Sequence, residues 1–76
     1  MISATYQAKS GRTLFRPIVS HDEISGLDTT GFCLACGEDQ SGVEPDARNY
    51  ACESCGETKV FGIEELVMRG IAQIAA

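Results

Sequence analysis

The sequence predicts a small metal-stabilised α+β domain, and three observations support this prediction. The chain has only 76 residues. All four of its cysteines lie in two matching segments, CLACG at 33–37 and CESCG at 52–56. Apolar residues near the C-terminus recur at helical spacing. A chain of this size forms one domain, and because its hydrophobic core gives only marginal stability, a disulfide, a metal or a partner is commonly needed.

The N-terminal part predicts a β-hairpin. Apolar and polar residues alternate over 2–8, with Ile2, Ala4, Tyr6 and Ala8 on one side, which is the period of a half-buried strand. The segment 9–12 supplies a turn, and 13–19 reads as the return strand. Because proline cannot donate a ladder hydrogen bond, Pro17 predicts that this strand lies at a sheet edge or ends there.

The central part predicts short elements around the two cysteine segments. SHDE at 20–23 fits a capping box and begins a helical turn that Gly26 ends. The polar and acidic stretch 37–48 predicts an exposed loop. Short strands are expected at 49–52, before the second cysteine segment, and at 58–61, after it.

The C-terminal part predicts an amphipathic helix. One helical face carries the apolar residues Ile63, Leu66, Val67, Gly70, Ile71 and Ile74. Glu65 and Arg69 form an i,i+4 pair that we expect on the outer face. Since glycine disfavours a helix, the helix either packs closely at Gly70 or frays after Arg69. Met68, on the outer face, is a candidate contact for a partner, although a single exposed methionine is ordinary.

The cysteine spacing predicts a metal site. Two residues between cysteines let a tight turn direct both sulfurs at one ion, with Zn–S distances of ~2.3 Å. A glycine after each pair allows the left-handed backbone of such a turn. The residues between the pairs, 37–51, match the spacing of a zinc site. We therefore predict one Zn²⁺ per chain with four ligands, which are Cys33, Cys36, Cys52 and Cys55.

The predicted metal also bears on folding. A structural zinc contributes on the order of 10–16 kcal/mol in small metal-dependent domains. Most domains are stable by only about 5–15 kcal/mol in total. We therefore predict that the metal-free chain is largely unfolded.

Charge is unevenly distributed along the chain. The formal net charge is −5. Residues 1–20 carry three bases, Lys9, Arg12 and Arg16, and no acid, whereas residues 21–47 carry seven acids and no lysine or arginine. Because affinity for nucleic acids comes mainly from neutralising phosphates, the acidic total argues against a general nucleic-acid binder. Contact with nucleic acid through the basic N-terminal arm remains an alternative.

Targeting signals are not evident in the sequence. The first residues lack the apolar core of a signal peptide, and no segment approaches ~18 consecutive apolar residues. We therefore expect a cytoplasmic protein with no membrane partner. Thiols stay reduced in the cytosol, which favours a metal over two disulfides.

The segment His21-Asp22-Glu23 followed by the first cysteine pair superficially matches a zinc deaminase signature. Phe32 stands where that signature has proline, and the nine residues of 24–32 are too few for the intervening elements. The second cysteine pair would also be left without a role. Four thiolates leave no open metal position for water or substrate. The sequence therefore predicts a non-enzymatic protein, with His21 on the surface.

Three stretches carry a family resemblance: GFCLACG, GVEPDARNYACESCG and VFGIEELVMRG. With these, the chain resembles the zinc-ribbon group, and residues 31–70 look like small uncharacterised zinc-ribbon proteins of bacteriophages and bacteria. The resemblance implies a structural zinc and a phage or prophage setting, but no activity. The first thirty residues lie outside this resemblance. From the length and the elements above, we predict a single domain, 1–76, with an N-terminal hairpin and linker at 1–30, a zinc ribbon at 31–61 and an amphipathic helix at 62–75.

The function we expect is that of a non-catalytic binding or adaptor protein with a protein partner, linked to phage or bacterial transcription. The alternative from another class is a rubredoxin-like electron carrier with iron on the same cysteines. Rubredoxins separate their cysteine pairs more widely and enclose the metal with more aromatic residues. A homodimer that buries the apolar stripe of the helix is a further alternative.

Overall fold

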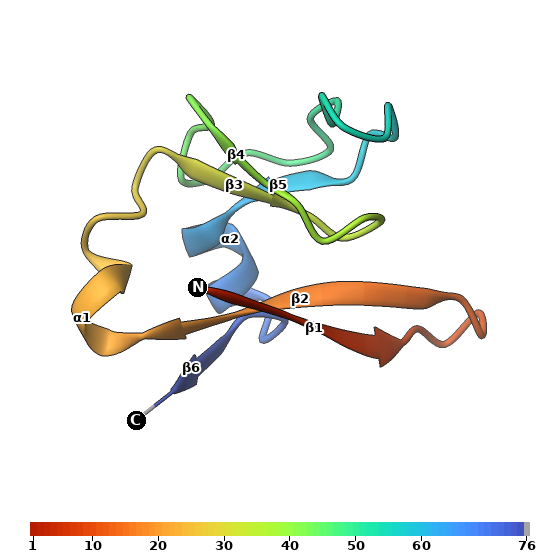
Figure 1. Cartoon of the computed structure of the whole chain (residues 1–76), viewed down its shortest axis with the longest axis horizontal. Helices are drawn as coiled ribbons and strands as arrows, with labels where there is room; N and C mark the ends of the chain where they lie inside the picture. Colours follow the sequence, from red (N-terminus) through yellow and green to blue (C-terminus); the bar gives the residue numbers. More distant parts are fainter. Residues whose placement is uncertain (76) are drawn as a thin grey trace.

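The structure is a computed structural model that describes residues 1–75. Two three-stranded sheets, with strand orders β1-β2-β6 and β4-β3-β5, lie one above the other in Figure 1, and α2 lies between them in this view. The elements in chain order are β1 (Ile2–Gln7), β2 (Thr13–Ser20), α1 (His21–Ile24), β3 (Thr30–Cys33), β4 (Asp39–Ser41), β5 (Val60–Gly62), α2 (Ile63–Met68) and β6 (Gln73–Ala75). The α+β class is confirmed, but the prediction of one helix is wrong because α1 is a second one.

Strands β1 and β2 form the predicted hairpin. They pair antiparallel from Ile2 opposite Ile18 to Gln7 opposite Thr13. The prediction that β2 lies at an edge is wrong, because β6 pairs with it in parallel over residues 18–20. Pro17 directly precedes this pairing, so its missing N–H costs no bond to β6. β2 is therefore the central strand of the hairpin sheet.

The hairpin sheet packs on the second sheet through the face opposite the one that carries Ile2. Pro17 and Val19 of β2 are buried, and Phe15 packs against the core while its backbone N–H donates to the carbonyl of Leu34 at 2.8 Å. Ile2, by contrast, is 66% exposed.

The core has two clusters, one on each side of the β4-β3-β5 sheet. The cluster toward the hairpin and α2 contains Phe32, Leu34, Phe61, Ile63 and Leu66. The cluster on the other side contains Cys33, Val43, Ala47, Cys52 and Val60. Successive residues of β3 and β5 alternate between the two clusters, as side chains of a strand do. The exposed loop predicted at 37–48 is therefore only partly exposed, since Val43 and Ala47 belong to the core.

Helix α2 ends earlier than predicted. The N–H of Ile71 donates to the carbonyl of Leu66 at 2.9 Å, and the N–H of Gly70 donates to the carbonyl of Val67 at 3.0 Å. These two bonds, with Gly70 at a φ of 72°, form a Schellman C-cap. The helix predicted over 62–75 is thus confined to 63–68. Neither helix in residues 1–75 is long and apolar enough to cross a membrane.

The short elements near the sheets follow the sequence in part. The predicted capping box of α1 is confirmed, since Ser20 Oγ accepts from the N–H of Glu23 and the Glu23 carboxylate accepts from the N–H of Ser20. The strand predicted at 49–52 is reduced to one bridge between Tyr50 and Val60. The strand predicted at 58–61 corresponds to β5, which begins two residues later.

Candidate metal centre

The first cysteine pair sits on the turn that joins β3 to β4. Cys33 is the last residue of β3, and its N–H donates to the carbonyl of Glu38 at 2.9 Å. The N–H of Gly37 donates back to the carbonyl of Cys33 at 2.9 Å. Gly37 has a φ of 79°, in the left-handed region that glycine adopts without strain. The turn between these two bonds presents Cys33 and Cys36 on the same side.

The second cysteine pair repeats this turn. The N–H of Cys52 donates to the carbonyl of Glu57, and the N–H of Gly56 donates to the carbonyl of Cys52, both at 2.9 Å. Gly56 has a φ of 80°. The same two bonds at the same sequence offsets explain why the two C-x-x-C-G segments have the same sequence pattern. We call the two turns the first and the second knuckle.

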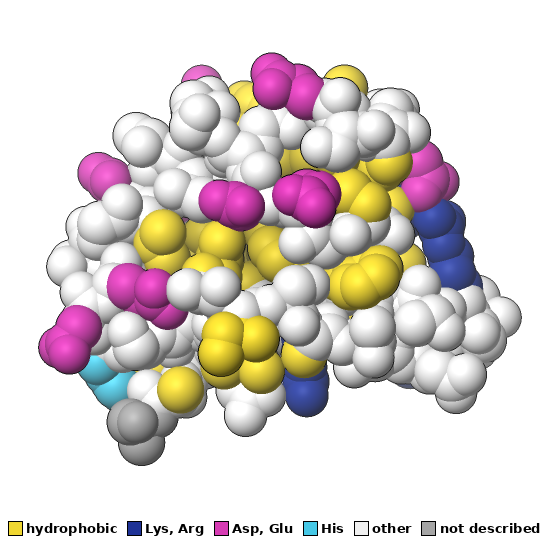
Figure 2. Space-filling view, viewed as in Figure 1, with side chains coloured by type: hydrophobic (Ala, Val, Ile, Leu, Met, Phe, Trp, Pro, Cys, Tyr) yellow, Lys and Arg dark blue, Asp and Glu magenta, His cyan; other side chains and the backbone are white. Residues whose placement is uncertain are grey.

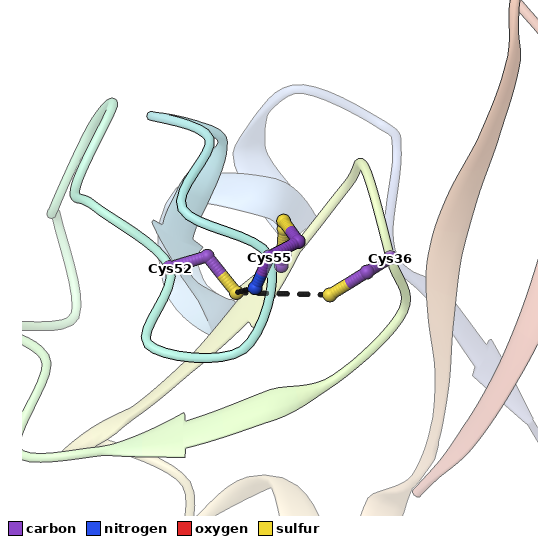
Figure 3. Close-up of side chains that lie close together, drawn as sticks. Cys36, Cys52 and Cys55 are labelled. Atoms are coloured by element: carbon purple, nitrogen blue, oxygen red, sulfur yellow. Dashed lines mark hydrogen bonds between the residues drawn. The ribbon is translucent and has the colours of Figure 1, made fainter.

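The two knuckles bring the four thiols together. The Sγ atoms of Cys33 and Cys55 are 3.7 Å apart, those of Cys36 and Cys52 are 3.6 Å apart, and all four lie within 4.8 Å of one another. Figure 3 shows Cys36 and Cys52 approaching each other from different segments of the chain. The predicted ligands are therefore assembled in one cluster.

The spacing of the sulfurs fits a metal ion and not disulfides. Four sulfurs at ~2.3 Å from one tetrahedral zinc would be about 3.8 Å apart. A disulfide requires an S–S distance of about 2.05 Å. The observed 3.6 and 3.7 Å are close to the tetrahedral value. The cluster is consistent with a zinc-ribbon-like site that can bind a metal ion.

Backbone amides favour the thiolate form of Cys52. Its Sγ accepts hydrogen bonds from the N–H groups of Cys55 at 3.4 Å and Ser54 at 3.3 Å. These bonds, led by the one from Cys55, lower the pKa of Cys52 to about 6. Figure 3 shows the nitrogen of Cys55 directed at this sulfur. The Cys52 thiol is thus more easily deprotonated, and its thiolate form can bind a cation.

In the first knuckle, burial of the thiols disfavours the thiolate form. It raises the pKa of Cys33 to about 12, and it also raises the pKa of Cys36. A cation at the centre of the cluster would favour the charged form of these thiols, because metal ligands must be deprotonated. Metal binding at this site is therefore coupled to the release of protons.

The knuckles differ in how the rest of the chain supports them. A Cβ added to Gly37 would lie 2.6 Å from Ser3 Oγ and 2.8 Å from the Phe15 ring, so the first knuckle rests directly on the hairpin sheet. Gly56 in the second knuckle faces open space. An ion pair between Arg12 Nη2 and Glu57 Oε2, at 2.5 Å, joins the hairpin tip to the second knuckle.

Other residues considered from the sequence lie away from the cluster. His21 is exposed at the start of α1, and in residues 1–75 the four cysteines are the one group of metal-binding side chains close enough to share an ion. Two of the three bases of the N-terminal arm, Arg12 and Arg16, have different surroundings. Arg12 is paired with Glu57, and Arg16 has a buried Nε without a hydrogen-bond partner in the described part of the chain.

Sequence reasoning missed the role of Glu65. We expected this residue on the outer face of the helix, but it is buried, with 5% of its surface exposed. The i,i+4 pair with Arg69 is confirmed, and Arg48 from the loop before the second knuckle approaches the same carboxylate. The backbone N–H of Glu65 also donates to the carbonyl of Pro45. The one sequence feature that could have indicated these contacts is the segment 45–48 ahead of the second knuckle, which contains both Pro45 and Arg48.

Comparison of the chain with known protein families, with curated proteins and with solved structures gave no match. The resemblance of residues 31–70 to phage and bacterial zinc ribbons therefore stays a prediction.

Proposed function

We propose that this protein is a zinc-ribbon binding module, in which one structural Zn²⁺ holds the fold and the surface binds a protein partner. The observation that carries the proposal is the pair of matched knuckles whose sulfurs stand 3.6 and 3.7 Å apart. Soft thiolates in a tetrahedral set are the donors typical of zinc or iron. Between these, zinc is our proposal.

A structural role for the metal follows from the ligand count. Catalytic zinc sites keep one position for water or substrate, whereas four cysteines complete the tetrahedron. Cys33 and Cys52 also belong to the second core cluster, in which they pack with Val43, Ala47 and Val60. An ion at this point would join the two knuckles and the loop between them.

A binding role is the function that such a module supports best. With four cysteine ligands, the metal would have no free coordination position for a substrate. Its role would be to hold the fold, and the folded chain would present the binding surface. On the resemblance of residues 31–70, we assign that surface to a partner in phage or bacterial transcription.

Metal content and the visible spectrum of freshly purified protein test this proposal. One zinc per chain in a colourless protein is the expected result. One iron per chain with strong visible absorption would overturn it in favour of a rubredoxin-like electron carrier. A folded protein that contains neither metal would overturn the structural-metal proposal altogether.

A further inference from the structure

A pocket with a volume of about 320 Å³ lies between the end of α1, the segment after it, and one side of α2. Its apolar lining comes from Ile24, Leu27, Ile63 and Val67. This volume is at the lower end of the range of roughly 300–1,000 Å³ for binding pockets, and it is large enough to hold one large apolar side chain.

The pocket is supported by the core. Ile63 is almost fully buried, and Leu27 and Val67 pack against the same cluster that contains Leu66. On the α1 side, the capping box of Ser20 and Glu23 holds the helical turn, and the N–H of Leu27 donates to the carbonyl of Ile24 at 3.2 Å. Both walls are therefore held in place without a ligand, which lowers the entropic cost of binding one.

Two carboxylates stand at the pocket. Asp28 and Glu64 line it and are both exposed. Within residues 1–75 neither forms a salt bridge, whereas Glu23, Glu57 and Glu65 each have a cationic partner. Figure 2 shows hydrophobic side chains with acidic ones on either side of them, and acidic side chains beside α1. The pocket thus combines an apolar lining with unpaired negative charge.

Helix α2 continues this surface. Met68 lies one turn after Glu64 and is 78% exposed. A flexible thioether adapts to irregular apolar partners. The side of α2 that borders the pocket therefore offers a second apolar contact next to the charge of Glu64.

We propose that this pocket binds one large apolar side chain of a basic segment in the partner protein, with neighbouring lysines or arginines paired to Asp28 and Glu64. The proposal rests on the proposed function of a protein-binding module. A side chain seated in a pre-formed pocket is the usual anchor of such an interface. The carboxylates at the pocket give selectivity for a basic partner and make its binding sensitive to salt.

A blocked tripeptide Lys-Leu-Lys, added to the zinc-loaded full chain, tests the proposal by amide NMR. We expect saturable shifts of the amide signals of Leu27 and Val67 at millimolar peptide, reduced by added salt. The peptide Glu-Leu-Glu should cause no such shifts. Saturable shifts confined to the hairpin sheet, or equal binding of the two peptides, would overturn the proposal.

Charge variants provide the matched control. The double variant Asp28→Asn/Glu64→Gln should weaken Lys-Leu-Lys binding about fivefold, because it removes both carboxylates that pair with the lysines and exposed ion pairs are individually weak. The double variant Asp39→Asn/Glu53→Gln removes two exposed acids elsewhere and should leave binding unchanged. Equal weakening in both variants would contradict a role for the pocket.

The zinc content and the dispersion of the amide spectrum separate this proposal from the proposed function. A zinc-loaded, well-dispersed protein that does not respond to Lys-Leu-Lys would overturn the pocket and leave the zinc module standing. A protein that folds without zinc would overturn the zinc module, whatever the peptide does.

Discussion

The carboxylate of Glu65 accepts a hydrogen bond from Arg69 Nε at 2.6 Å, although the Glu65 side chain is only 7% exposed. The guanidinium of Arg69 also lies over the Phe61 ring, 5.0 Å from its centre. Arg48 Nε approaches the same carboxylate oxygen at 3.2 Å. One buried acid thus joins helix α2 to the loop that leads into the second knuckle.

This contact gives a prediction about acid stability. Hydrogen bonding from Arg69, with the nearby charge of Arg48, holds the pKa of Glu65 below its ordinary value of 4.5. A carboxyl whose pKa is lowered by folding adds stability above its unfolded pKa, and this stability is lost as pH falls through the folded pKa. We therefore expect Glu65→Gln to lower the thermal unfolding midpoint at neutral and weakly acidic pH.

The difference in thermal unfolding midpoint between wild type and Glu65→Gln should stay constant until the pH falls below about 4.5. Below that pH the difference should become smaller. Thermal unfolding followed by circular dichroism across this range measures it. Because protons compete with the metal for the thiols, zinc content is determined at each pH, and the two proteins are compared only where both retain zinc. Glu64→Gln is the matched control, because Glu64 is in the same helical turn but has no salt bridge among the described residues. A Glu65→Gln protein as stable as Glu64→Gln at pH 7 would refute the role of the contact.

The clustering of the four cysteines could be predicted from the sequence because the information is local. Within each knuckle, two backbone bonds and one glycine with positive φ act over six residues, and the C-x-x-C-G pattern encodes that turn. The burial of Glu65 could not be predicted in the same way. It depends on the loop around Pro45 folding back onto α2, which is a contact between segments about twenty residues apart.

The second prediction concerns the metal. Cys52→Ser removes the thiolate that accepts two backbone N–H bonds and leaves three cysteines in the cluster. If zinc contributes on the order of 10–16 kcal/mol, its loss exceeds the stability of most domains and the chain should unfold. Zinc content and the dispersion of the amide spectrum measure this effect.

Ser54→Ala is the control for Cys52→Ser. Ser54 contacts the Cys52 sulfur through its backbone N–H, which an alanine keeps. This variant should retain zinc and the wild-type fold. A folded, metal-free Cys52→Ser protein would contradict the structural role of the metal, as would the removal of zinc by a chelator without unfolding.

The end of helix α2 shows where a periodic pattern misleads. Ile71 and Ile74 continue the apolar stripe, yet Ile71 follows the helix and packs back on the core, and Ile74 lies in β6. A glycine on the stripe can permit close packing or end the helix, and the spacing of apolar residues does not separate these cases. At Gly70 the left-handed backbone ends the helix.

The third prediction tests this helix end. Gly70→Ala places a Cβ on a backbone with a φ of 72°, where nothing lies within 4 Å, so its cost is conformational and about 1 kcal/mol. Gly26→Ala is the control, because the φ of Gly26 is not in the left-handed region and its Cβ would meet only the Glu23 carbonyl oxygen, at 3.6 Å. Chemical unfolding of the zinc-loaded proteins measures both. Equal stabilities of the two variants would argue against the C-cap.

The fourth prediction concerns the close approach of Gly62 to the loop before the second knuckle. Gly62 precedes α2 with a φ of −64°, which any residue can adopt, so its backbone alone does not require glycine. A Cβ there would collide with the backbone carbonyl oxygens of Glu44 and Pro45, which cannot move aside as a flexible side chain can. The N–H of Gly62 also donates to the carbonyl of Ala47 at 3.1 Å, which holds the loop at this distance.

Gly62→Ala should therefore lower the free energy of unfolding by about 1–3 kcal/mol, the usual cost of forcing extra atoms into a packed site. Gly42→Ala in the same loop is the contrasting variant, because its φ of 73° makes it strained while its Cβ would meet open space. If steric collision with the loop is the cause at Gly62, Gly62→Ala should shift the amide signals of Glu65 and Arg48. Gly42→Ala, which strains only its own backbone, should leave these signals in place. Unfolding in urea and the amide spectra together decide this, because a Gly62→Ala protein with wild-type stability and spectra would mean that the loop does not pack against α2.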